Sequence, residues 1–137
     1  MLNVGIIGFG KMGQIRAQAL EASGRANIKL VYDENEIQQP TNYNIEKNIK
    51  KVINDSNIDA LFICTPNYLN KPLTIQSLEA GKHVFCEKPP AFSSTEVEEI
   101  ISVEIKSGKT LMYGFNHRHH ESIKHMKSLI YSGEYGN

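Results

Sequence analysis

The chain has 137 residues, of which 40% are hydrophobic and 22% charged, the composition of one globular domain with its own core. Its 15 lysines and arginines balance 15 aspartates and glutamates, so the basic surface of a nucleic-acid-binding protein is not expected. No apolar run approaches the roughly 20 residues of a membrane-spanning helix, and the first predicted strand follows Met1 at once, which leaves no room for a signal peptide. We therefore expect a cytoplasmic protein that binds neither nucleic acid nor membrane, with Cys64 and Cys86 as buried, reduced thiols.

Short apolar runs alternate with helical patterns in the first half of the chain. The run at 2–7 predicts a strand buried on both faces, and a helix is expected over 11–23. A second strand is expected at 28–32. The polar segment 34–44 has no clear periodicity, so a second crossover helix there is predicted to be short or absent. One face of the following helix is marked by four apolar residues: Ile45, Ile49, Val52 and Ile53.

The alternation continues in the second half. Strands are predicted at 60–64, 83–86 and 110–115. Helices are predicted at 73–80, from Ser93 or Ser94 to Lys106, and over a final segment with Ile123, Met126, Leu129 and Ile130 on one side. Strands that alternate with helices favour a parallel sheet with right-handed crossovers, so the expected fold class is α/β, a doubly wound Rossmann domain.

A glycine motif, Gly8-Phe9-Gly10-Lys11-Met12-Gly13, follows the first predicted strand and opens the first predicted helix. In a dinucleotide-binding turn the first glycine allows the tight bend, the second lets the backbone approach the pyrophosphate, and the third lets helix and strand pack closely. The N–H groups at the helix N-terminus would then bind the phosphates.

Asp33 stands after the second predicted strand, at the spacing of a residue that binds the adenosine ribose hydroxyls. A carboxylate there repels a 2′-phosphate, and no arginine stands beside it, so NAD is favoured over NADP. The alternative is a tight strand–helix turn with a solvated Asp33.

Lys88 is the candidate proton-transfer group, although most lysines are only solvated surface residues. Glu87 precedes it at the end of a predicted strand, and Pro89-Pro90 stiffens the backbone that follows. We predict a cis Lys88–Pro89 bond that aims the side chain toward the carboxyl edge of the sheet. An ammonium group held there can give or take a proton while a nicotinamide handles the hydride.

These motifs resemble the N-terminal half of the Gfo/Idh/MocA oxidoreductases, the glucose–fructose oxidoreductase and inositol dehydrogenase family. The resemblance extends over essentially the whole chain and includes Gly8 to Gly13, Asp33, Thr65-Pro66-Asn67, Glu87-Lys88-Pro89 and Gly114-Phe115-Asn116-x-Arg118. It implies that Lys88 is the catalytic lysine and that Glu87 lies near the nicotinamide ribose. It further implies that Thr65, Pro66 and Asn67 line the nicotinamide side, and that Asn116 and Arg118 lie between cofactor and substrate.

The resemblance also implies a second α/β domain, which forms the substrate floor and carries an Asp-x-x-x-His motif beyond Asn137. We therefore expect a Rossmann domain at 1–118 and, at 119–137, a linker helix and the start of the second domain. Where the family commonly has an aromatic residue after the Asn-x-Arg element, this chain has His119 and His120. With His117 and His125 they could form a metal site, but their spacing matches no standard zinc pattern, so we expect no metal.

The expected activity is NAD-dependent hydride transfer to or from a secondary alcohol of a sugar, polyol or related metabolite, with Lys88 handling the hydroxyl proton. We expect the 137-residue chain to be inactive by itself and to expose apolar surface around its last strand and last helix. Homo-oligomerisation stays open. The rival interpretation is a module that binds NAD without catalysis, or a partner subunit.

Overall fold

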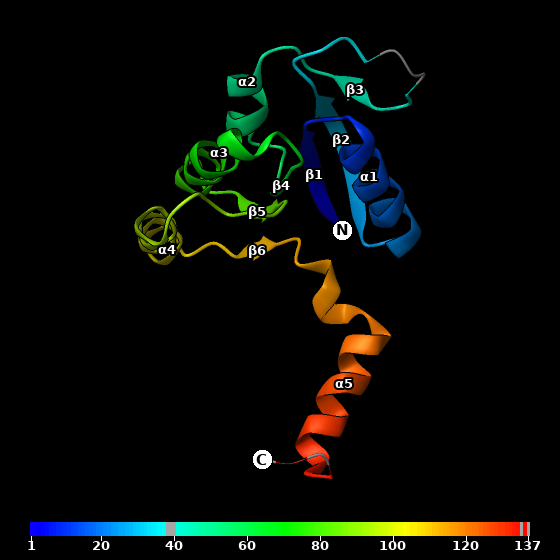
Figure 1. Cartoon of the computed structure of the whole chain (residues 1–137). Coiled ribbons are helices and arrows are strands. Elements are labelled where there is room, and N and C mark those ends of the chain that lie inside the picture. Colours follow the sequence, from blue (N-terminus) through cyan, green and yellow to red (C-terminus); the bar gives the residue numbers. More distant parts are fainter. Residues whose placement is uncertain (38–40, 135, 137) are drawn as a thin grey trace.

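A computed structural model describes residues 1–37, 41–134 and 136. Its centre is a six-stranded sheet with the order β3-β2-β1-β4-β5-β6, in which every neighbouring pair is parallel (Figure 1). The strands are β1 Leu2–Ile7, β2 Ala26–Tyr32, β3 Asn44–Ile45, β4 Ala60–Ile63, β5 His83–Cys86 and β6 Leu111–Tyr113. The helices are α1 Lys11–Ser23, α2 Ile49–Asn54, α3 Asn67–Glu79, α4 Ser94–Ser107, the 3₁₀ helix η1 Asn116–His119, and α5 Glu121–Ser132. The predicted α/β class and parallel sheet are confirmed.

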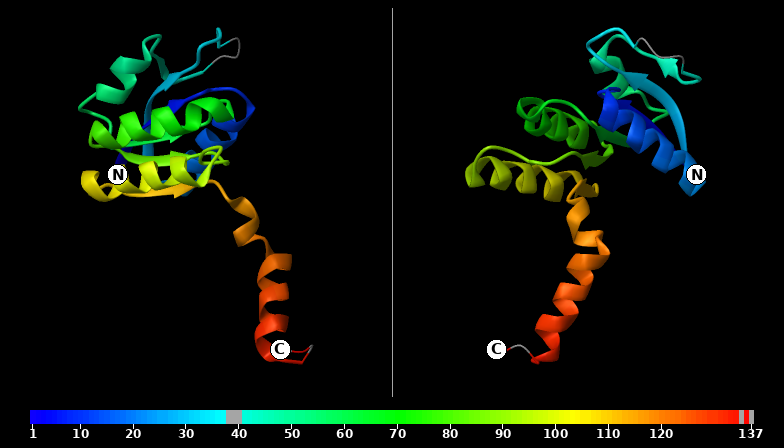
Figure 2. Two further views of the ribbon diagram at one scale, coloured as in Figure 1. Left: turned by 60° about the vertical axis from the view of Figure 1, so that its left-hand side comes forward. Right: turned by 45° about the vertical axis from the view of Figure 1, so that its right-hand side comes forward.

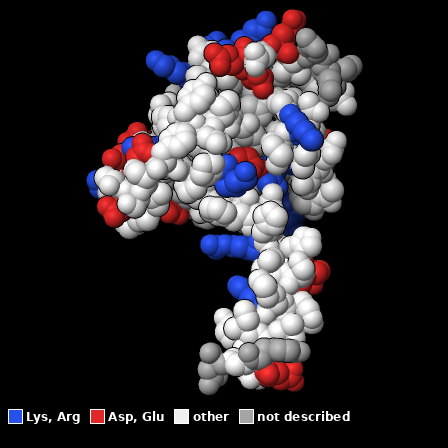
Figure 3. All heavy atoms as spheres, in the orientation of Figure 1, with Lys and Arg blue, Asp and Glu red and all other residues white. Residues whose placement is uncertain are grey.

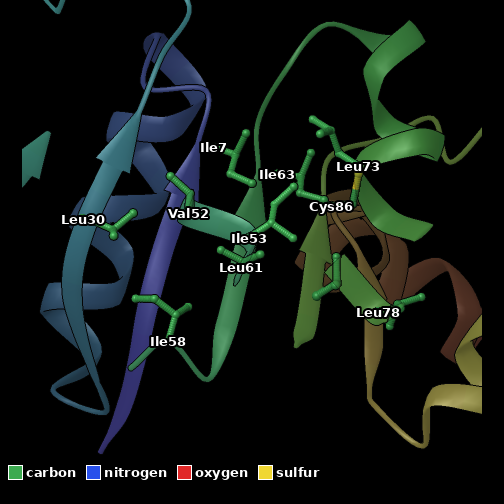
Figure 4. Packing of buried hydrophobic residues seen from close by; sticks show 11 residues of the cluster. Ile7, Leu30, Val52, Ile53, Ile58, Leu61, Ile63, Leu73, Leu78 and Cys86 are labelled. Atoms are coloured by element: carbon green, nitrogen blue, oxygen red, sulfur yellow. The ribbon is translucent and has the colours of Figure 1, made fainter. Parts of the chain in front are cut away.

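Helices cover both faces of the sheet, and each face has its own apolar cluster. Ile6 and Ile7 are adjacent in β1 and both fully buried, but they belong to different clusters because successive side chains of a strand point to opposite faces. Ile6 packs with Ala17 of α1, whereas Ile7 packs with Val52 of α2 (Figure 4). Burial on both faces explains the apolar run at residues 4–7 of β1.

The connection after β2 differs in part from the prediction. No helix is present in the described residues of 34–44, which agrees with the expected short or absent crossover helix; Gln38, Gln39 and Pro40 lie outside the described residues. The assignment of Ile45 to the next helix is wrong, because Ile45 pairs with Val31 as part of β3. Helix α2 begins only at Ile49, where the side chain of Asn48 accepts a hydrogen bond from the Lys50 N–H and caps the helix.

Several predicted boundaries shift by a few residues. Helix α3 begins at Asn67, not at 73, and contains Pro72, which removes one backbone donor but does not end the helix. Strand β2 starts earlier than 28, and β6 is shorter than 110–115. The cap of α4 is Ser93, whose hydroxyl accepts from the Glu96 N–H, and the helix ends at Gly108 in the left-handed conformation.

Helix α5 projects away from the sheet and its covering helices (Figures 1 and 2). None of its residues is buried, and Met126 and Ile130 are 50% and 63% exposed. Met112 on the edge strand β6 is 52% exposed. The expected apolar surface around the last strand and helix is therefore present. No helix in the described part of the chain is long and apolar enough to cross a membrane.

Candidate cofactor and active site

The three glycines of the motif have different surroundings. Gly8 has φ +89°, and a Cβ there would lie 2.6 Å from the Cys64 carbonyl oxygen. A Cβ on Gly13 would overlap the carbonyl oxygen of Gly8, because helix α1 packs directly against the turn. A Cβ on Gly10 would meet nothing within 4 Å. The turn thus needs Gly8 and Gly13 for folding, and the space beside Gly10 is open for a ligand.

The N-terminus of α1 offers backbone donors next to this space. Gly10 is the N-cap and provides no side-chain acceptor, and the first turn contains no acidic residue. The first N–H groups of an α-helix have no intrahelical partner, so those of Lys11, Met12 and Gly13 are placed to bind an anion. Phe9 is buried and its ring packs edge-on against Tyr43 at 5.8 Å, which holds the turn from its other side.

Asp33 joins the end of β2 to the glycine turn. Its Oδ2 accepts from the Phe9 N–H at 2.7 Å, and its Oδ1 accepts from the Asn35 N–H at 2.9 Å. These bonds tie the Asp33 carboxylate to the glycine turn and to the start of the following loop. Asp33 lines two neighbouring hollows. One has a volume of about 560 Å³ and extends toward β3, and the other has a volume of about 380 Å³ and extends toward Gly10. A carboxylate between them is placed to accept from hydroxyl groups of a ligand that spans both.

Residues 65–67 lie where β4 ends and α3 begins. The Thr65 hydroxyl oxygen is buried and has no hydrogen-bond partner among the described residues. Pro66 and Asn67 are exposed, with Pro66 as the N-cap of α3. A buried hydroxyl without a partner is costly. Together with the open space at Gly10 and the donors of α1, it fits a site that a dinucleotide completes.

Lys88 follows directly after β5, and the Lys88–Pro89 peptide bond is cis, as predicted. Its side chain is exposed. The backbone on either side of it is held by Asn70 of α3, which is fully buried and donates through Nδ2 to the carbonyl oxygens of Glu87 at 3.0 Å and Pro89 at 2.8 Å. The sequence offered no signal for Asn70, since the residue stands before the predicted start of its helix.

Glu87 is paired with a residue that the sequence analysis did not select, Arg16 of α1. Arg16 Nε donates to Glu87 Oε1 at 2.7 Å, and Arg16 Nη2 donates to Asn116 Oδ1 at 3.1 Å. Arg118 is not part of this group; it is exposed, with its guanidinium 5.6 Å from the centre of the Phe115 ring. Figure 3 shows basic and acidic side chains together near the centre of the drawn face, surrounded by uncharged surface.

Neither cysteine is a candidate nucleophile. Burial raises the pKa of the Cys64 and Cys86 thiols to about 12, and the nearby Glu87 carboxylate acts in the same direction. Both thiols are free, and they stay protonated at neutral pH. The described residues contain no group of three or more His, Cys, Asp or Glu side chains that could hold a metal ion, so His117, His119, His120 and His125 do not come together as one.

The sequence that contains the glycine turn and the lysine after β5 matches a known protein family. The Gfo/Idh/MocA family model, described as an oxidoreductase family with an NAD-binding Rossmann fold, matches residues 2–115. The chain belongs to this family. It is 30% identical over 141 residues to myo-inositol 2-dehydrogenase of Thermotoga maritima, covering 98% of this chain and 42% of that protein. It is 32% identical over 144 residues to glucose-6-phosphate 3-dehydrogenase of Bacillus subtilis, covering 100% of this chain and 40% of that protein.

Solved structures of similar proteins have the same fold. The crystal structure of an NAD-binding protein from Listeria innocua superposes with a TM-score of 0.90 at 30% identity, over 99% of this chain and 42% of that one. The Gfo/Idh/MocA chain described here therefore spans about two-fifths of the length of the relatives it matches.

Proposed function

We propose that this chain is the cofactor-binding part of an NAD-dependent oxidoreductase that acts on a secondary alcohol of a sugar, a polyol or a related metabolite. The observation that carries the proposal is that three features lie along the same edge of the sheet, at the carboxyl ends of parallel strands. These are the open position at Gly10 after β1, Asp33 after β2, and Lys88 after β5. Ligands of doubly wound folds bind at this edge of the sheet.

The proposed roles follow from where the residues lie. The N–H groups at the start of α1 bind the pyrophosphate, and Asp33 accepts from the adenosine ribose. Thr65, Pro66 and Asn67 line the nicotinamide side, and Glu87 lies near the nicotinamide ribose. A bound nicotinamide supplies the hydride chemistry. Lys88 takes the hydroxyl proton during oxidation and returns it during reduction, and Asn116 and Arg118 stand between cofactor and substrate.

The preference for NAD over NADP is argued from charge. Asp33, Glu34 and Glu36 line one hollow together with a single lysine, Lys47. Acidic side chains next to the ribose repel a 2′-phosphate, whereas they accept hydrogen bonds from an unmodified 2′-hydroxyl.

Calorimetric titration with NADH and NADPH tests the cofactor assignment. We expect tighter binding of NADH, and Asp33→Ala should weaken NADH binding about 10- to 100-fold, since a hydrogen bond to a charged group contributes roughly 1.5–3 kcal/mol. Glu98→Ala, which removes an exposed carboxylate on α4 that does not line this hollow, is the matched control. Equal affinities for the two cofactors, or tighter NADPH binding, would contradict the assignment.

The substrate class is inferred from two relatives named for inositol and for glucose 6-phosphate. Residues 1–118 would be the Rossmann domain and 119–137 the linker helix and the start of the second domain. Catalysis needs a substrate held close to its reacting geometry, and such positioning can supply roughly 7–11 kcal/mol of barrier lowering. We expect that the 137-residue chain binds NADH without turnover, because Lys88 and the nicotinamide would be only one wall of the site.

Turnover assays on the chain and on a longer protein that includes the proposed second domain, called the full-length protein below, test this division with a panel of sugars and cyclic polyols. The full-length protein should form NADH from NAD, and Lys88→Ala should abolish that activity while leaving NADH binding intact. Lys106→Ala, at an exposed lysine in the last turn of α4, should leave both unchanged. Turnover by the 137-residue chain alone would contradict the proposal that this chain holds only part of the active site. No turnover in the full-length protein, with NADH still bound, would favour a non-catalytic module.

A further inference from the structure

We propose that Arg16 is a positioning residue that couples the phosphate-binding helix to the nicotinamide end of the cofactor site. The inference rests on the proposed function, because it concerns how a dinucleotide is held. Arg16 lies in the second turn of α1, whose first turn would bind the pyrophosphate. Its guanidinium reaches across to the end of β5 and to η1.

The Arg16–Glu87 pair is largely shielded from water. The side chains are 15% and 11% exposed, and the guanidinium uses both Nε, at 2.7 Å, and Nη2, at 2.5 Å, on Glu87 Oε1. The guanidinium also lies 4.8 Å from the centre of the Phe85 ring, on β5. Arginine's planar fork suits this combination of pairing and stacking, which a lysine cannot reproduce.

The backbone of Gly114 packs against the Arg16–Glu87 pair. A Cβ at Gly114 would lie 2.9 Å from Glu87 Oε2 and 3.2 Å from Arg16 Nη2, so the ion pair packs directly against a bare backbone. The Gly114 N–H in turn donates to the Cys86 carbonyl oxygen at 2.9 Å. Phe85, Gly114 and Asn116 therefore leave the guanidinium little freedom to move.

Two consequences follow for a bound dinucleotide. First, Arg16 fixes the position of Glu87 relative to the start of α1, and so relates the phosphate end of the site to the nicotinamide end. Second, it neutralises a carboxylate that would otherwise stand unpaired near an anionic cofactor. A shielded ion pair contributes little net stability because desolvation offsets its attraction. The main effect expected of this pair is therefore on orientation and local charge.

Binding of two ligands to the 137-residue chain tests whether Arg16 acts at the nicotinamide end of the site or affects cofactor binding as a whole. NADH occupies the whole proposed site, whereas ADP-ribose lacks the nicotinamide and reports on the phosphate and adenosine end alone. We expect Arg16→Gln to weaken NADH binding about tenfold or more and to leave ADP-ribose binding within about twofold. Arg25→Gln, at an exposed arginine just beyond α1, should change neither affinity.

The double variant Arg16→Gln/Glu87→Gln tests the charge argument. Because it removes the carboxylate together with its partner, it should bind NADH more tightly than Arg16→Gln does. Arg16→Lys keeps the charge without the fork, so it should lose NADH affinity to an intermediate extent, and it carries the comparison if Arg16→Gln does not fold.

Two results would overturn the inference, and a third would remove its charge argument. Equal losses for NADH and ADP-ribose would assign Arg16 to the phosphate helix alone, and unchanged NADH affinity in Arg16→Gln would leave it no role. A double variant no better than Arg16→Gln would remove the charge argument. A wild-type chain that binds neither ligand is a different outcome, because it refutes the proposed function itself and this inference with it.

Discussion

Gly10 and Gly13 belong to one motif, but a methyl group would meet different surroundings at each. At Gly10, where φ is −72° and the space is open, Gly10→Ala should leave thermal stability nearly unchanged. The same methyl group would occupy the space proposed for the pyrophosphate, so NADH affinity should fall at least roughly tenfold.

Gly13→Ala is the contrasting variant, because its Cβ would overlap the Gly8 carbonyl oxygen and force the helix away from the turn. Overpacking of this kind costs about 1–3 kcal/mol or more of folding free energy. Thermal unfolding and NADH titration of both variants check the pair of expectations. A Gly10→Ala variant that binds NADH normally would mean that the phosphates do not approach this backbone.

The two buried thiols predict a loss of stability at alkaline pH. Their pKa in the folded chain is raised to about 12 from the ordinary 9.0. The folded state thus holds these protons more tightly than the unfolded state, so their contribution is complete below pH 9.0 and is lost as the pH rises toward about 12. Urea unfolding across this pH range should show a decline that is shallower in Cys64→Ser/Cys86→Ser. An equal slope in that variant would assign the decline to other groups, such as Tyr43 and Tyr113, whose pKa values are also raised to about 12.

At the scale of elements, Asn70 connects helix α3 to the segment that carries Lys88. Asn70→Ala would leave the carbonyl oxygens of Glu87 and Pro89 without their donor. An unsatisfied buried acceptor costs about 1–3 kcal/mol, and we expect a loss of stability in this range by urea unfolding. Gln76→Ala, which removes an exposed amide from the same helix, is the control and should be nearly neutral. Similar effects of the two substitutions would show that the two hydrogen bonds donated by Asn70 contribute nothing to stability.

The elements that the sequence predicted well are those with local signals. Strand β1 and helix α1 have their predicted bounds because a short, mostly apolar run ends at the glycine turn, and Gly24 ends the helix in the left-handed conformation. Ile45 was misassigned because a two-residue strand has no periodicity of its own and is defined only by its pairing with β2. The proline at position 72 hid the start of α3 for a related reason, since its effect depends on the helix around it.

The residues of the candidate site also divide into those with a local sequence signal and those without one. The glycine motif and Lys88 could be identified from the sequence because the residues that mark them are close neighbours in the chain. Arg16 and Asn70 were missed because their partners are separated from them by 71 and by 17 and 19 positions, distances that only the folded sheet closes. Sequence alone gives no reason to choose Arg16 over any other arginine on a helix.

At the scale of the whole molecule, the exposed apolar side of α5 predicts self-association of the 137-residue chain. Met126 and Ile130 stand one turn apart on a helix with no buried residue, and the next residue, Tyr131, is 84% exposed. Apolar surface of this kind is normally covered in a stable protein. In the full-length protein the proposed second domain would cover it; in the 137-residue chain a second copy can take that place.

Sedimentation velocity over a range of concentrations measures this association. The wild-type chain should form larger species as its concentration rises, and Met126→Glu/Ile130→Glu should shift the distribution toward the monomer, because a charge buried at an interface without a partner is costly. Ser128→Glu/Ser132→Glu adds the same charge at exposed positions on the opposite side of the helix, so it controls for simple charge repulsion. If both double variants reduce association equally, net charge and not the apolar face of α5 is responsible. If neither does, the chain associates through another surface, and the exposed edge strand β6 with Met112 becomes the next segment to substitute.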